Sequence, residues 1–160
     1  MPAQLKTEFT LPSDPTNVFE MLTSLDFLAA KIGLAQSGDF SVTGSGFDLT
    51  VNVNRTVAAD LPDLVRKFVG QTLVVQETQI WRKSSDNLYT AEFKLIIPNA
   101  PVDISGQIEL SGIEKTIVKI LGKVKVNVPI FGAAAEPQVV SQISKVLADE
   151  EELCRNWISK

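Results

Sequence analysis

The chain has 160 residues, 44% of them hydrophobic and 21% charged, with a formal net charge of −4. This length and composition predict one globular domain spanning residues 1–160. The acidic balance argues against a nucleic-acid partner, which would need clustered lysine and arginine. With no histidine and one cysteine, Cys154, the chain cannot build a histidine-dependent triad or an intrachain disulfide, and no metal site is expected.

The sequence also lacks the common targeting and cofactor signals. Its first residues do not combine a basic stretch with an apolar core, so no signal peptide is expected. No apolar run approaches the roughly 20 residues that cross a bilayer. Motifs for nucleotide phosphates and for calcium are missing as well. We therefore expect a cytoplasmic protein with no cofactor and no integral membrane segment, and its oligomeric state stays open.

The N-terminal third predicts a strand and two short helices. Residues 4–11 alternate between apolar and polar side chains, which is typical of a half-buried strand. Asp14 and Pro15 then form the pattern of a helix N-cap followed by a first-turn proline. A second helix is expected to begin at Asp26 and to end near Gly33.

Residues 38–57 predict two extended segments, and the second alternates cleanly. Arg55 falls on the apolar face of this second segment, where a charge is unexpected. Residues 61–69 follow with helical spacing inside a connection between two strands. Because long ordered connections often cover a site, we expect this helix to be a mobile cover.

Four more strands are predicted over residues 73–81, 89–97, 102–110 and 116–128. Their short connections favour an antiparallel meander. Glu77 and Gln79 share the inward face of the first of these strands, and Tyr89 and Phe93 share the inward face of the second.

Residues 137–158 predict a long amphipathic helix. At 100° per residue, its large apolar side chains, including Trp157 near the centre, occupy one arc of about 140°. Glu150 lies inside this arc. It forms a salt bridge or lies at a solvated edge, or else it points into a cavity between helix and sheet.

Together these elements predict an α+β fold in which a strongly curved antiparallel sheet of about seven strands wraps around a long C-terminal helix. This order resembles the helix-grip fold of the START and birch-pollen-allergen (SRPBCC) superfamily, and within it an actinobacterial family of unknown function. The resemblance is carried by four segments: Asp60-Leu61-Pro62 through Val69-Gly70, the strand from Leu73 to Trp81, the Val128-Pro129 junction, and Glu151 to Ile158 with Trp157.

The resemblance covers nearly the whole chain and implies a single START/polyketide-cyclase-like domain. Relatives in the superfamily hold lipids, sterols, polyketides or quinones in a cavity between the sheet and the C-terminal helix, and some are cyclases or hydrolases. The resemblance therefore implies a hydrophobic small-molecule ligand. It carries over no catalytic residues.

Three functions remain open. The first is binding of a lipophilic ligand in an apolar cavity with a few polar groups. The candidate ligand-binding residues are Arg55, Glu77, Gln79, Tyr89, Phe93 and Glu150. Against this, Arg55 and Glu77 could form a cross-strand ion pair within a packed core.

The second is an enzyme, such as a cyclase or dehydratase, with Glu150 or Glu77 as base and Tyr89 as acid. The third is a non-catalytic interaction protein whose core is filled by side chains.

Overall fold

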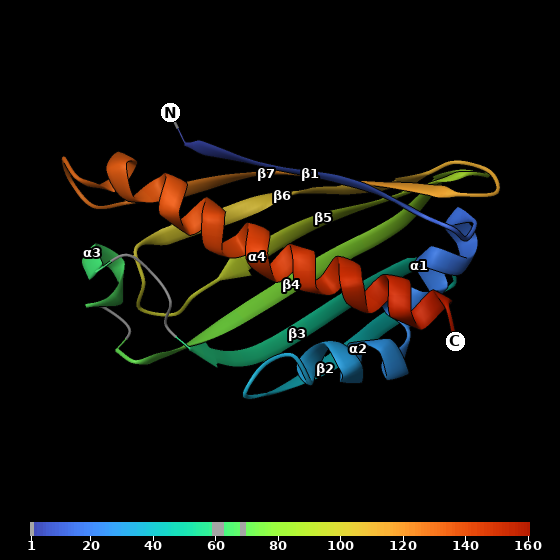
Figure 1. The fold of residues 1–160 in the computed structure, drawn as a ribbon, viewed down its shortest axis with the longest axis horizontal. Coiled ribbons are helices and arrows are strands. Elements are labelled where there is room, and N and C mark those ends of the chain that lie inside the picture. The colour runs from blue at the N-terminus through green and yellow to red at the C-terminus, as the bar shows by residue number, and fades with distance from the viewer. Residues whose placement is uncertain (1, 59–62, 68–69) are drawn as a thin grey trace.

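Within the described residues, 2–58, 63–67 and 70–160, seven antiparallel strands form one open sheet, and a long C-terminal helix crosses one of its faces (Figure 1). The structure is a computed structural model. The strand order is β1-β7-β6-β5-β4-β3-β2, so β1 and β2 are the sheet edges. This arrangement confirms the predicted α+β fold.

The strands and helices follow the predicted order. The strands are β1 (Ala3–Leu11), β2 (Ser37–Ser45), β3 (Asp48–Ala58), β4 (Thr72–Ser85), β5 (Leu88–Ile96), β6 (Val102–Ser111) and β7 (Thr116–Val126). The helices are α1 (Pro15–Thr23), α2 (Leu25–Ile32), α3 (Asp63–Arg66) and α4 (Gly132–Ile158).

The alternation of each strand decides which residues face α4. In the β3–β4 pair, Arg55 lies opposite Val75 and Val53 lies opposite Glu77. Residues opposite each other share a face, and so do residues two apart on one strand. Arg55 and Glu77 are therefore diagonal neighbours on the face that α4 covers.

The caps of the two N-terminal helices explain their boundaries. Asp14 accepts a hydrogen bond from the Asn17 amide at 2.8 Å and caps α1, as predicted. The second helix begins at Leu25, one residue before the start that the sequence predicted at Asp26. Ser24 is its cap, accepting a bond from the Phe27 amide at 3.2 Å.

The C-terminal helix begins five residues earlier than predicted, at Gly132, with Pro137 inside it. The end of β7 holds these extra turns. A Cβ at Gly132 would lie 2.0 Å from the carbonyl oxygen of Val126, so only glycine allows this approach. Buried Glu136 accepts a hydrogen bond from the Val126 amide at 2.9 Å. These contacts offset the hydrogen bond that Pro137 cannot donate.

The end of α4 is less buried than the sequence predicted. Trp157, expected at the centre of the buried arc, is half-buried and forms a T-shaped contact with Phe27, with ring centroids 5.6 Å apart. Cys154 is the fully buried residue of this last part of the helix.

The predicted cover over residues 61–69 is only partly described. Its middle forms α3, which lies at the opposite end of the molecule from α1 (Figure 1). Residues 61, 62, 68 and 69 lie outside the described residues, so the cover stays a prediction. No helix in the described ranges is long and apolar enough to cross a membrane.

Candidate ligand-binding site

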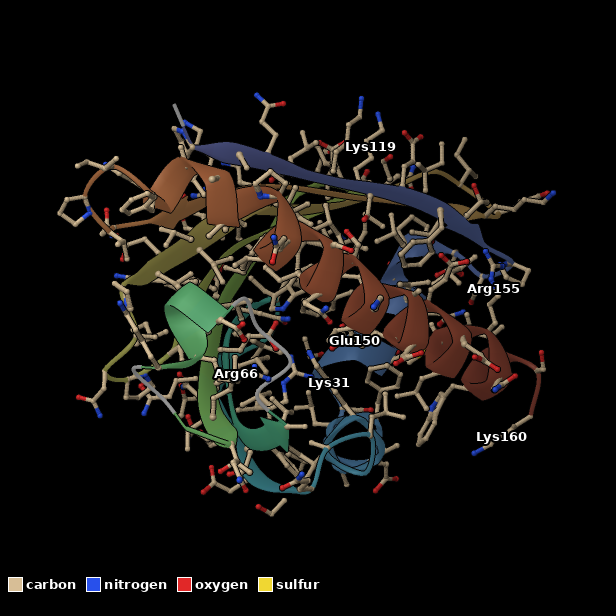
Figure 2. The ribbon with its side chains drawn as sticks, turned by 60° about the vertical axis from the view of Figure 1, so that its left-hand side comes forward. Lys31, Arg66, Lys119, Glu150, Arg155 and Lys160 are labelled. Atoms are coloured by element: carbon tan, nitrogen blue, oxygen red, sulfur yellow. The ribbon has the colours of Figure 1, made fainter. Side chains whose placement is uncertain are left out.

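Four charged side chains meet between the sheet and α4. Lys31 Nζ lies 2.9 Å from Glu77 Oε1, and Arg55 Nη2 donates to the same oxygen at 3.0 Å. Arg55 Nη1 donates to Glu150 Oε1 at 3.0 Å, and Lys31 Nζ lies 3.6 Å from that oxygen. Figure 2 shows Lys31 of α2 next to Glu150 of α4. These residues form the charge cluster, which joins α2, β3, β4 and α4.

Two further side chains extend the charge cluster along β4. Gln79 Nε2 donates to Glu77 Oε2 at 2.8 Å, and Trp81 Nε1 donates to Gln79 Oε1 at 2.9 Å. Within the described residues, no buried side-chain nitrogen or oxygen lacks a hydrogen-bond partner. The cost of burying these polar groups is therefore offset by pairing.

The charge cluster favours the ionised form of its members. Burial alone would raise the pKa of Glu77, but Lys31 and Arg55, with hydrogen bonds from Lys31 and Gln79, lower it to about 2. For Lys31 burial would lower the pKa, yet the carboxylates of Glu150 and Glu77 outweigh this and raise it. The same carboxylates raise the pKa of Arg55 against its burial. All three side chains are therefore charged at neutral pH.

An apolar groove of about 380 Å³ opens between the sheet and α4, beside the charge cluster. It is lined by Leu34, Ala35, Arg55, Val57, Ala58, Leu73, Val75, Leu95, Ile97, Ile104, Val139, Gln142, Ile143, Lys145, Val146 and Asp149. Val146 belongs to the apolar arc of α4 but is 42% exposed. Among the described residues, the apolar side of the helix is thus partly exposed where the groove opens.

Two small voids lie around the charge cluster, of about 60 and 50 Å³. Arg55 lines both the groove and the larger void, and Glu150 lines both voids. The Arg55–Glu150 pair therefore stands between the open groove and the small spaces beyond it.

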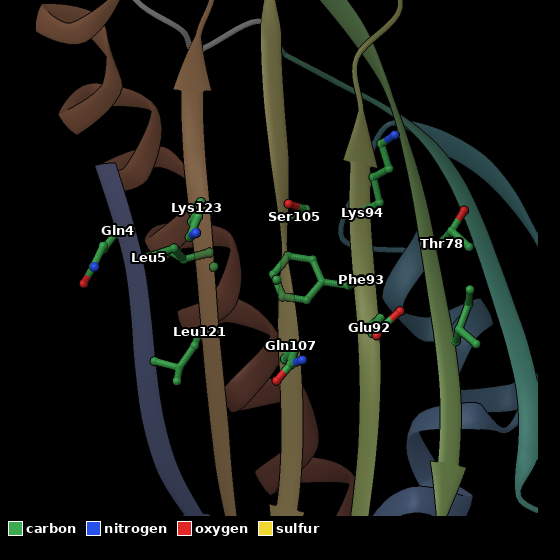
Figure 3. Close-up of a pocket in the computed structure, with 13 residues that line it drawn as sticks. Gln4, Leu5, Thr78, Glu92, Phe93, Lys94, Ser105, Gln107, Leu121 and Lys123 are labelled. Atoms are coloured by element: carbon green, nitrogen blue, oxygen red, sulfur yellow. The ribbon is translucent and has the colours of Figure 1, made fainter. Parts of the chain in front are cut away.

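A separate hollow of about 790 Å³ lies on the outer face of the sheet, with α4 behind the strands (Figure 3). Phe93 lines both this hollow and the 60 Å³ void. A Cβ at Gly122 would lie 3.1 Å from Phe93 Cζ, so the ring occupies the space that this glycine leaves. Phe93 therefore separates the two spaces and does not line the groove.

The structure brings together four of the six candidate residues: Arg55, Glu77, Gln79 and Glu150. Tyr89 lies apart from them, because its ring stacks on Phe19 of α1 at 4.8 Å between centroids. Its hydroxyl lies 2.7 Å from Thr16 Oγ1. Tyr89 lines neither the groove nor the two voids.

Lys31, which is only 4% exposed, is a member of the charge cluster that was not predicted from the sequence. The signal was present, since Lys31 follows Phe27 by four positions and Leu28 by three. These spacings put it on the apolar side of α2. A charged residue on the apolar side of a helix is the same feature that made Glu150 a candidate on the long C-terminal helix.

Within the described part of the chain, no group of three or more His, Cys, Asp or Glu side chains is arranged to hold a metal ion. Cys154 lies beside Glu150, and burial together with that carboxylate raises the pKa of its thiol to about 12. The thiol is therefore protonated and unreactive at neutral pH.

Comparison with known families decides where this chain belongs. The sequence profile of the family described as "Protein of unknown function (DUF2505)" matches residues 6–158. The chain belongs to this family. No curated protein matches it.

Solved structures share its fold at low identity. The Zhui aromatase/cyclase from Streptomyces sp. R1128 has a TM-score of 0.64 at 12% identity, over 96% of this chain and 92% of the other. Ara h 8.0201 has a TM-score of 0.61 at 14% identity, over all of both chains.

Norcoclaurine synthase from Thalictrum flavum, solved with dopamine and hydroxybenzaldehyde, has a TM-score of 0.59 at 12% identity, over 99% of this chain and 88% of the other. These likenesses show that the chain has the helix-grip fold.

Proposed function

We propose that this protein binds a lipophilic small molecule, such as a lipid, polyketide, quinone or sterol-like compound, in the groove between β3–β6 and α4. The observation that carries the proposal is the groove itself, whose apolar walls belong to the helix–sheet interface and which the side chains of the described residues leave open. Its volume of about 380 Å³ falls in the range of small-molecule sites.

The polarity of the groove supports this proposal. Its walls are mostly aliphatic, and Arg55 is the buried charged residue among those that line it. An apolar ligand would remove the exposed faces of Ile143 and Val146 from water, which is favourable in proportion to the area covered. The shared fold of an aromatase/cyclase and of a synthase solved with two small aromatic compounds is consistent with such a role.

The other two functions have less support. A core filled by side chains does not account for the groove. For the enzyme, the proposed acid Tyr89 is bonded to Thr16 and lies apart from the carboxylates. Glu77, with a pKa of about 2, would be a weak base.

The proposal is tested with Nile red, a neutral lipophilic dye whose fluorescence rises in apolar surroundings. We expect saturable binding to the purified protein. Val146→Trp should abolish it, because the new ring would fill the groove. Ala148→Trp is the matched control, since Ala148 is exposed on α4 and does not line the groove. Equal binding by both variants would place the dye elsewhere and contradict the proposal.

Native mass spectrometry of the protein purified from its own host would then identify the ligand. We expect a co-purifying lipophilic compound in the wild type that is missing from Val146→Trp.

A further inference from the structure

We infer that the ligand carries a carboxylate, or a similar planar oxyanion, and that this head group replaces Glu150 on Arg55. The inference rests on the proposed function and names the class of ligand for the same groove. It follows from three observations: Arg55 lines the groove, Glu150 is the most exposed member of the charge cluster and has fewer hydrogen bonds than Glu77, and the cluster has equal numbers of positive and negative charges.

Arg55 is placed to receive such a group. Its side chain is 9% exposed and lines both the groove and the void behind it. The other charged residues along the groove, Lys145 and Asp149, are exposed on α4. The buried part of the groove therefore presents one cation, with the planar donor geometry that matches a carboxylate.

Glu150 is the replaceable member of the charge cluster. Its side chain is 19% exposed, whereas those of Lys31, Arg55 and Glu77 are 5%, 9% and 9% exposed. Both oxygens of Glu77 accept hydrogen bonds, from Lys31 and Arg55 on one and from Gln79 on the other. Glu150 accepts through Oε1 from Arg55, with Lys31 farther away.

The charge balance selects the ligand class. The cluster contains two cations and two carboxylates. If a ligand carboxylate replaces Glu150 and Glu150 turns toward solvent, the buried charge stays neutral. A neutral alcohol in the same place would leave buried Arg55 short of a counter-charge, and a cationic ligand would add a third positive charge. Both are costly in a poorly solvated interior.

Dodecanoic acid and 1-dodecanol form a matched pair of probes, because they share a chain and differ in head group. Isothermal titration calorimetry at neutral pH should show that the acid binds about tenfold more tightly, the gain expected from a charge-assisted bond. Glu150→Gln should raise affinity for the acid further, about threefold or more, by removing the competing charge, and should leave the alcohol unchanged. Glu151→Gln is the matched control, since Glu151 pairs with Arg155 on the outer side of α4.

The double variant Arg55→Leu/Glu150→Leu keeps the charges balanced through Lys31 and Glu77 and guards against misfolding of a single Arg55 variant. It should bind both probes equally, whereas an Arg55 with only a structural role would leave the preference for the acid intact. Equal affinities in the wild type, or a preference that survives the double variant, would overturn the inference and leave the proposed function standing. Binding of neither probe would overturn the inference, and if Nile red also failed to bind, the proposed function would fall with it.

Discussion

At the scale of single residues, the charges on apolar faces are explained by one another. Arg55, Glu77, Lys31 and Glu150 come from four different elements and meet in one cluster. A lone charge at this depth would be costly, and pairing offsets that cost without adding much net stability. The charge cluster therefore matters most when one member is removed.

Mutation of the Arg55–Glu150 pair measures this effect. Arg55→Leu leaves two carboxylates facing Lys31 alone and should cost about 3–5 kcal/mol of unfolding free energy. Glu150→Leu leaves Arg55 bonded to Glu77 and should cost only about 2 kcal/mol. In urea denaturation, the double variant should lose clearly less unfolding free energy than the sum of the losses of the two single variants. Additive losses would show that the pair does not stabilise the fold as a unit.

The lowered pKa of Glu77 predicts a dependence of stability on pH. Its carboxyl has a pKa of about 2 in the folded protein against an ordinary value of 4.5. A lowered folded-state pKa contributes stability that is fully present above the unfolded pKa and is lost as pH falls through the folded one. About 3 kcal/mol should therefore disappear between about pH 4.5 and pH 2.

Urea denaturation between pH 7 and pH 2 checks this. Glu77→Gln should be less stable at pH 7 and should show a shallower loss over the acid range. Parallel curves for the wild type and the variant would mean that other carboxyls cause the acid sensitivity.

At the scale of elements, α4 has three parts that make different contacts. Its first turns pack on the end of β7 through Gly132 and Glu136. Its middle forms one wall of the groove and carries Glu150. Its last turns return to the core at Cys154 and contact α2 through Trp157. The fully buried residues of α4 therefore lie in its first turns and near its end.

The two tryptophans test this division. Trp157 is half-buried, with Lys160 Nζ 4.6 Å from its ring centre, so Trp157→Ala should cost about 2 kcal/mol, below the range for a core residue. Trp81 is 1% exposed and donates to Gln79, so Trp81→Ala should cost about 3–5 kcal/mol. Chemical denaturation of both variants gives the comparison, and an equal loss would mean that Trp157 is as buried as the sequence suggested.

At the scale of the whole molecule, the face of the sheet that carries the helices has a packed part and an open part. Near α1 it is covered by aromatic rings, where Phe19 of α1 contacts both Trp81 of β4 and Tyr89 of β5. Toward the connection between β3 and β4 the groove separates the sheet from α4. A ligand in the groove would therefore bridge the sheet and the helix.

Such a bridge should stabilise the entire fold. A lipophilic ligand present at 100 times its dissociation constant should raise the unfolding free energy by about 2.7 kcal/mol, if it binds only the folded protein. Thermal denaturation with increasing Nile red should show a rising midpoint for the wild type and for Ala148→Trp. The midpoint of Val146→Trp should stay constant, and a rise in this variant would place the stabilising site outside the groove.

The sequence by itself determined the fold class and the direction in which most side chains point. Period-two alternation over β3, β4 and β5 and the apolar arc of α4 are local properties, so they can be read without knowing which elements meet. For the same reason Arg55, Glu77, Gln79 and Glu150 stood out as polar residues on inward faces. Tyr89 satisfied the same criterion, but an inward face says nothing about which part of the interface a residue reaches.

Only the tertiary structure decided which of these residues meet and where the interface stays open. Lys31 joins the charge cluster because α2 packs next to β2 and α4, a contact between segments far apart in the chain. The start of α4 depends likewise on the end of β7, which holds Gly132 and Glu136 in place and outweighs the local signal of Pro137. The groove is what remains where side chains from β3 to β6 and α4 do not fill the space between their backbones. Such a volume depends on all of its walls at once, and therefore no local pattern of residues encodes it.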